Sequence, residues 1–167
     1  MISLKKKNNE VFYCKNKVEF INYKHINFLK KKVEFSKRKR ARICMHNNDN
    51  SKLHEMIIIL SKETYIRPHK HLNKAESLHV IEGSADVIFF DDKGNVLKKK
   101  RLGGKNNNMN FYYRVSRSIF HTLKIRSKYF IFHESTQGPF IKSKTKYANW
   151  SPSENDKLRA INFMKSI

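Results

Sequence analysis

The chain has 167 residues, enough for one domain with a hydrophobic core and too few for two domains of ordinary size. Hydrophobic residues make up 39% of it and aromatic residues 12%, and this aromatic share excludes an intrinsically disordered protein. The formal net charge is +22, but lysine dominates over the arginine that specific phosphate or base recognition favours, and no helix-turn-helix, finger or RRM pattern occurs, so we expect no specific nucleic acid partner.

The first forty residues differ from the rest of the chain. Between residues 18 and 32, apolar side chains recur among lysines at a spacing that predicts an amphipathic helix with one face toward the core. Such a basic helix can also lie on a membrane surface, and we favour packing against the domain. The lysines near the N-terminus are followed by Asn8, Asn9 and Glu10 rather than by an apolar stretch, which does not match a signal peptide.

From residue 42 onward, short β-branched and aromatic segments alternate with turn residues, which is typical of an all-β sandwich or barrel. The expected strands span residues 42–46, 54–60, 65–71, 77–82, 85–91, 96–102, 111–115, 120–125 and 129–134. Residues 91–95 predict a hairpin turn, and residues 103–110 predict a polar loop. After residue 138 the alternation ends, and we expect a tail with a short helix near residues 154–164.

One short segment contains residues that typically bind metal ions. His69 and His71 are two residues apart on an expected strand, so both imidazoles point to the same face, with backbones roughly 7 Å apart. After a four-residue turn, Glu76 opens the next strand and can face the same point. His121, on a later strand, is the best candidate for a fourth ligand. Imidazoles and a carboxylate suit a divalent first-row metal.

The spacing HxH, four residues, Glu, six residues, Gly resembles the first motif of the cupin superfamily, with Gly83 as the closing glycine. The segment that ends at His121 resembles the second motif, PxGxxH, although Ser116 and Ser118 replace the proline and glycine. The bacterial WbuC family of cupin-fold metalloproteins is similar to residues 36–46, 54–56, 65–83, 111–114, 133–136, 138–140 and 150–152. This resemblance covers about residues 36–152. It implies a role in O-antigen or other surface-polysaccharide biosynthesis, without naming a reaction.

The expected fold is therefore an all-β cupin jelly-roll barrel with an N-terminal helical extension and a short C-terminal tail. We expect the extension to span residues 1–41, the barrel 42–140 and the tail 141–167. One divalent ion (Fe, Mn, Ni or Zn) is expected at His69, His71, Glu76 and His121. His79 is excluded as a ligand, because strand alternation from Glu76 points it the other way.

Further residues are candidates for contact with a small molecule at the mouth of the barrel. Arginine binds carboxylate or phosphate, and tyrosine stacks on sugars and rings. The candidates are Arg67, Lys74, Tyr112, Tyr113, Arg114 and His133. Arg40 and Arg42 are similar candidates at the edge, and for all of these a purely structural role is the alternative.

These features lead to a metal-binding protein that binds or acts on an anionic or sugar-derived molecule, such as a sugar nucleotide. Alternatives are an Fe(II)-dependent dioxygenase and a non-catalytic small-molecule-binding cupin, so the sequence does not decide whether the chain is an enzyme. The two cysteines, Cys14 and Cys44, form no CxxC pair and indicate a reducing cytoplasm. No apolar run is long enough to span a membrane, and a homodimer is compatible with the sequence.

Overall fold

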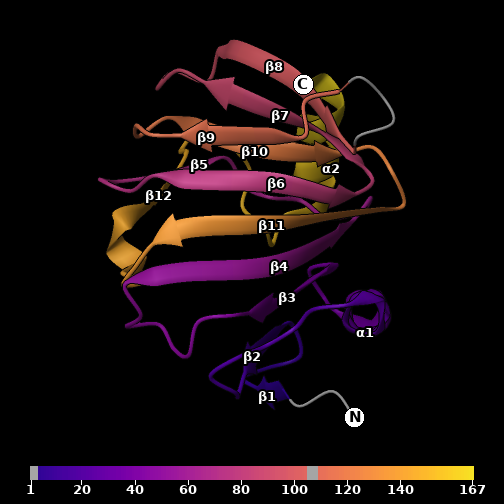
Figure 1. The fold of residues 1–167 in the computed structure, drawn as a ribbon. Helices are drawn as coiled ribbons and strands as arrows, with labels where there is room; N and C mark the ends of the chain where they lie inside the picture. Colours follow the sequence, from indigo (N-terminus) through magenta and orange to yellow (C-terminus); the bar gives the residue numbers. More distant parts are fainter. Residues whose placement is uncertain (1–3, 105–108) are drawn as a thin grey trace.

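The computed structural model describes residues 4–104 and 109–167, so part of the loop expected at 103–110 lies outside the described residues. The described strands form two sheets (Figure 1). The strands are β1 Leu4–Lys6, β2 Val11–Cys14, β3 Arg40–Cys44, β4 Leu53–Ser61, β5 His69–His71, β6 Glu76–Glu82, β7 Ser84–Phe90, β8 Val96–Gly103, β9 Tyr112–Val115, β10 Phe120–Ile125, β11 Tyr129–Gln137 and β12 Thr145–Tyr147. The helices are α1 Tyr23–Phe35, α2 Lys157–Ser166 and the short 3-10 helix η2 Lys142–Lys144.

The larger sheet has seven strands in the order β1-β2-β3-β4-β11-β6-β9, and the smaller has five in the order β12-β5-β10-β7-β8. Neighbouring strands are antiparallel, except that β2 runs parallel to β3. A main core lies between the sheets and includes Leu60, Phe130 and Phe132 from the larger sheet, with Val87 and Leu123 from the smaller one. These strands make the protein β-rich as expected, although no pairing of described strands joins the two sheets into a closed barrel.

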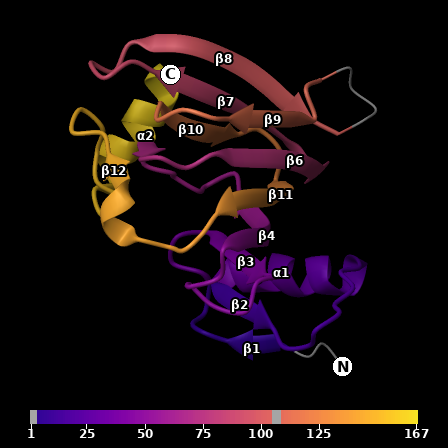
Figure 2. The same cartoon turned by 60° about the vertical axis from the view of Figure 1, so that its left-hand side comes forward.

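Helix α1 covers the outer face of the larger sheet (Figure 2). Its buried residues Ile26, Leu29 and Val33 follow helical spacing and pack with Ile43 and Ile59 of the sheet. The helix begins later than expected because the Asn22 side chain accepts a hydrogen bond from the Lys24 amide and caps the first turn. Val18 is therefore outside the helix, and it is exposed.

Helix α2 covers the outer face of the smaller sheet. Ile88, Phe90 and Phe120 of that sheet pack with Trp150 and Phe163, which the C-terminal segment supplies. The helix begins after Asp156, whose side chain caps it, close to the expected position. The part of the chain expected to be a tail thus returns to the sheet, and it also adds the edge strand β12 beside β5.

Each strand expected from the sequence overlaps an observed one, but the segment 65–71 is a strand only in its last three residues. Pro68 has no amide hydrogen for a strand ladder, and regular pairing starts directly after it. Strands β1 and β2 were not expected at all. Gly83, the closing glycine of the motif, has a φ of +85°, and a Cβ there would lie 2.1 Å from the Tyr129 carbonyl oxygen. No described helix is long and apolar enough to cross a membrane.

Candidate metal centre

Three histidines from neighbouring strands of the smaller sheet meet on its inner face. His69 and His71 lie on β5 and point the same way, and His121 on β10 is the direct cross-strand partner of His69. The ring of His69 is centred 5.0 Å from that of His71 and 4.7 Å from that of His121. One nitrogen from each ring lies within 4.8 Å of the others, so the group could hold a metal ion.

Each of these imidazoles has its Nδ1 atom engaged by a neighbour. The Nδ1 atoms of His69 and His121 lie 2.9 Å from the Arg67 carbonyl oxygen and 3.0 Å from the Ile119 carbonyl oxygen. A carbonyl oxygen only accepts, so Nδ1 carries the proton in both rings and Nε2 keeps its lone pair when the ring is neutral. His71 Nδ1 lies 3.2 Å from Thr145 Oγ1 on β12. These contacts orient the rings as partners of metal-bound histidines do.

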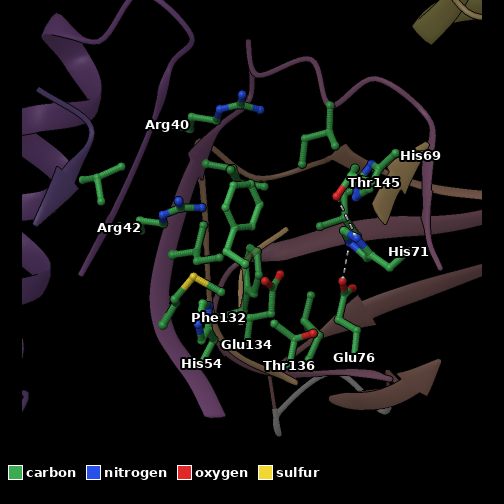
Figure 3. A pocket seen from close by; sticks show the side chains of 18 of the residues that line it. Arg40, Arg42, His54, His69, His71, Glu76, Phe132, Glu134, Thr136 and Thr145 are labelled. Atoms are coloured by element: carbon green, nitrogen blue, oxygen red, sulfur yellow. Dashed lines mark hydrogen bonds and ion pairs between the residues drawn. The ribbon is translucent and has the colours of Figure 1, made fainter. Parts of the chain in front are cut away.

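Glu76 reaches the histidines from the opposite sheet, at the first residue of β6 (Figure 3). Its two carboxylate oxygens lie 3.3 Å from His71 Nε2 and 3.5 Å from His121 Nε2. The side chain is almost completely buried. Burial raises the pKa of this carboxyl, but the charge and hydrogen bonds of His121 and His71 outweigh it and hold the pKa well below the usual range. Glu76 therefore presents a negative charge to the three rings.

Burial and Glu76 act differently on two of the histidines. Burial, together with the charge of the neighbouring His121, lowers the pKa of His69 to about 3. Burial also opposes protonation of His121, but the carboxylate of Glu76 raises the pKa of this ring. The neutral form of His69 is the form that binds metal ions.

A cavity of about 360 Å³ adjoins the histidines and runs between the two sheets. Figure 3 shows His69 and His71 on one side of it, and Arg40 and Arg42 reaching in from β3 on the other. Part of its lining is apolar and includes Ile58 of β4 and Phe132 of β11. This volume is within the range of small-molecule sites in proteins.

Three of the six expected small-molecule contacts line this cavity, namely Arg67, Lys74 and Tyr113. Arg67 is also engaged in the fold, because its guanidinium donates to the Ala148 carbonyl oxygen at 2.8 Å. Lys74 Nζ donates to the Pro139 carbonyl oxygen at 2.6 Å.

The other three expected contacts, Tyr112, Arg114 and His133, are not among the residues that line the cavity. His133 lies on the outward face of β11, with Nε2 3.6 Å from the carboxylate of Glu55. His79 is exposed and packs its ring near Phe111, away from the metal-binding group, as alternation required.

The cavity also contains residues that the sequence analysis did not predict. Glu134 lines it, and burial together with the nearby negative charge of Glu76 raises the pKa of Glu134 to about 8. Alternation along β11 from the buried Phe130 and Phe132 could have identified it. Thr145 and Tyr147 also line the cavity, but they lie in the segment where alternation had ended.

A family model described as a domain of unknown function (DUF6016) matches residues 21–102, just under half of the chain. No curated protein matches the sequence.

Several solved structures are similar to the chain at low sequence identity. CapF with the inhibitor 3-isopropenyl-tropolone has a TM-score of 0.53 and 10% identity, over 67% of this chain and 32% of that one. The recombinant pro-11S globulin of pumpkin has a TM-score of 0.51 and 13% identity, over 68% and 29%. The DMSP lyase DddQ from Ruegeria pomeroyi DSS-3 has a TM-score of 0.50 and 14% identity, over 68% and 54%.

The chain thus matches about half or less of the length of each of these structures. All three are cupin-fold proteins, and the likeness concerns the fold alone. Together with the two packed sheets, it shows that this chain has a β-rich cupin fold.

Proposed function

We propose that this chain binds one divalent metal ion through His69, His71, His121 and Glu76, and that the ion holds a small molecule in the adjoining cavity. The observation that carries this proposal is the convergence of three imidazole nitrogens within 4.8 Å of one another, next to a buried carboxylate. A neutral His121 turns its Nε2 lone pair toward the buried carboxylate of Glu76, and a cation between these atoms would be stabilised by all four groups.

The residues present fit such an ion. The Nε2 lone pairs of His69 and His121 face the group because their Nδ1 atoms donate to backbone carbonyl oxygens. Fe²⁺, Mn²⁺, Ni²⁺ and Zn²⁺ all accept imidazole and carboxylate ligands. A bound ion of this kind polarises a carbonyl or hydroxyl oxygen and lowers the pKa of water. The protein's own part is to orient the rings and to keep the carboxylate charged.

The finer proposal is that the small molecule is a sugar or sugar-nucleotide derivative of bacterial surface-polysaccharide biosynthesis. It rests on the resemblance of residues 36–152 to the WbuC family, and on the arginines and tyrosines beside the cavity. Two other functions use the same group. An Fe(II)-dependent dioxygenase would consume oxygen when loaded with iron, and a non-catalytic cupin would bind its ligand without turnover.

Metal analysis of protein purified without a histidine tag tests the central proposal. We expect close to one equivalent of a divalent metal, and its loss when His69 and His71 are both changed to alanine. His79→Ala is the matched control, because it removes an exposed imidazole three residues beyond Glu76 and should leave the metal content unchanged. Absence of metal in the wild-type protein, even after incubation with Zn²⁺ or Fe²⁺, would contradict the proposal.

A further inference from the structure

The wall of the cavity opposite the histidines belongs to the larger sheet. Arg42 on β3 pairs with Ile58 on β4, and Ile58 pairs with Phe132 on β11, so these three residues form one row across the sheet. All three line the cavity. Figure 3 shows the Arg42 side chain directed into it from β3. One wall thus carries the metal-binding group and the other carries a guanidinium.

The two arginines of β3 differ in their partners. Arg40 makes two hydrogen bonds to the carboxylate of Glu154, both of 3.1 Å, so its charge is already neutralised. Among the residues that the structure describes, no carboxylate oxygen lies within 4.0 Å of the Arg42 guanidinium. Arg42 therefore makes no ion pair of this kind, and its fork of hydrogen-bond donors lines the cavity.

The positions of the strands bear on the size of the ligand. Arg42 is on β3 and Glu76 on β6, and β4 and β11 lie between them. Three strand spacings of roughly 4.8 Å separate β3 from β6 by about 14 Å across the sheet. Glu76 also lies four residues along β6 from Val80, the residue that pairs with Phe132, so the two backbones are further apart than this. The apolar side chains of Ile58 and Phe132 lie along this path. A molecule that contacts both ends must therefore have a body of several atoms.

We propose that Arg42 binds a terminal carboxylate or phosphoryl group of an extended small molecule whose other end supplies oxygen atoms to the group of His69, His71 and His121. Arginine forms paired hydrogen bonds with both kinds of anion, so the shared chemistry is a planar or tetrahedral oxyanion. This inference rests on the proposed function, because it takes the histidine end as the metal centre. It adds that the small molecule must carry an anionic group at the end that lies away from the histidines.

Three probes that share one chelating end test this requirement. Gluconate carries a 2-hydroxycarboxylate and a terminal hydroxyl, whereas 6-phosphogluconate and glucarate carry a terminal phosphate and a terminal carboxylate in its place. We expect calorimetric titration of the zinc-loaded protein to show at least about tenfold tighter binding of one of these two than of gluconate. The probe that binds tighter identifies the anion. Arg42→Gln should abolish the difference, because the neutral amide cannot form the paired charged hydrogen bonds.

Arg159→Gln is the matched control, because it makes the same charge change at an exposed arginine of α2. It should keep the full preference. If Arg42→Gln does not fold, Arg42→Lys tests the same contact, since lysine keeps the charge without the two-pronged geometry and should reduce the preference about threefold. Equal binding of the three probes, no binding of any, or a preference that survives in Arg42→Gln would overturn the inference.

Metal content measured on the same samples separates the two proposals. If the wild-type protein holds about one zinc ion but shows no preference for an anionic end, the role of Arg42 is wrong and the metal centre stands. If the protein holds no zinc and shows no preference, both proposals fail. If the protein holds no zinc and still shows the preference, Arg42 is supported as the anion contact and the metal centre is contradicted.

Discussion

Two buried carboxylates, one on each sheet, have opposite surroundings. Asp86 on β7 is 2% exposed and is bound by the guanidinium groups of Arg101 and Arg126. Glu76 on β6 is 6% exposed and faces the imidazoles of His71 and His121. Burial raises the pKa of both carboxyls, and in both cases the hydrogen bonds and positive charges of the neighbours outweigh it and lower the pKa.

The difference between them is the chemistry of the partner. A guanidinium is permanently charged and only donates hydrogen bonds, so it neutralises Asp86 and cannot bind a metal. An imidazole can be neutral and then offers a lone pair, so the charge of Glu76 remains available to a cation. The two buried acids therefore differ in their surroundings, because Asp86 faces permanent cations and Glu76 faces potential metal ligands.

The largest expected effect is on the affinity for Zn²⁺, which substitution of Glu76 should lower and substitution of Asp86 should not. Glu76→Gln should lower the affinity for Zn²⁺ by about 100-fold, because it removes the negative charge and a ligand oxygen from the group. Asp86→Asn should leave the affinity within about twofold of wild type. Titration of Zn²⁺ against a competing chelator measures both.

A Glu76→Gln protein that binds Zn²⁺ as tightly as wild type would contradict this distinction. Glu76 would then serve only as a hydrogen-bond partner of the imidazoles. In that case its role would be the same as that of Asp86.

The two substitutions should affect the free energy of unfolding in the reverse order, with the larger loss for Asp86→Asn. Asp86→Asn should lower the free energy of unfolding by about 2 kcal/mol at pH 7, because the charged hydrogen bonds from Arg126 and Arg101 are lost. The folded pKa of Asp86 lies below its usual value of 3.8, so its contribution is complete above that pH and is lost as the pH falls toward the folded pKa. Urea unfolding of both proteins should therefore give a constant difference from pH 7 to about pH 5 and a shrinking one below pH 3.8.

Glu134→Gln is a control, because Glu134 should change the pH dependence of the free energy of unfolding in the opposite direction to Asp86. Burial raises the pKa of Glu134 to about 8, so in metal-free protein the folded state holds a proton that the unfolded state has released between about pH 4.5 and 8. The free energy of unfolding of the wild-type protein should fall as the pH rises through this range. Glu134→Gln should remove the part of this fall that Glu134 causes. A pH dependence of Asp86→Asn that resembles that of Glu134→Gln would contradict the assignment of Asp86 as a permanently ionised partner.

The sequence predicted the convergence of His69, His71 and Glu76 better than the ion pairs of Asp86, for a physical reason. His69, His71 and Glu76 are close in the chain, and strand alternation with one turn is enough to bring them together. The partners of Asp86 lie 15 and 40 residues away and depend on the register of β7 with β8 and β10. His121 is an intermediate case. The second motif predicted it as a ligand, but it lies beside His69 only because β10 pairs with β5.

The N-terminal strands illustrate the same limit of local patterns. Strand β2 pairs in parallel with β3 only after the chain has passed through α1, so its partner is fixed by a distant crossover. Strand β1 contains two lysines and is an exposed edge strand, where alternation of apolar residues is not required. Strand β1 thus carries no local signal that distinguishes it from a polar terminus, whereas the apolar run of β2 is a short strand signal that does not identify its partner.

The smallest expected effect concerns how the imidazoles are held. A guanidinium reaches Asp86 with several donors, whereas His71 depends on Thr145, whose Oγ1 lies 3.2 Å from its Nδ1. Thr145→Val keeps the shape of the side chain and removes this contact, so the ring loses its fixed orientation. We expect the affinity for Zn²⁺ to fall about tenfold, with the free energy of unfolding of the metal-free protein changed by less than about 1 kcal/mol. Thr136→Val, in the same cavity but bonded to the Ala75 carbonyl oxygen, is the matched control. An equal loss of affinity in both variants would mean that cavity packing, rather than orientation of His71, sets the affinity.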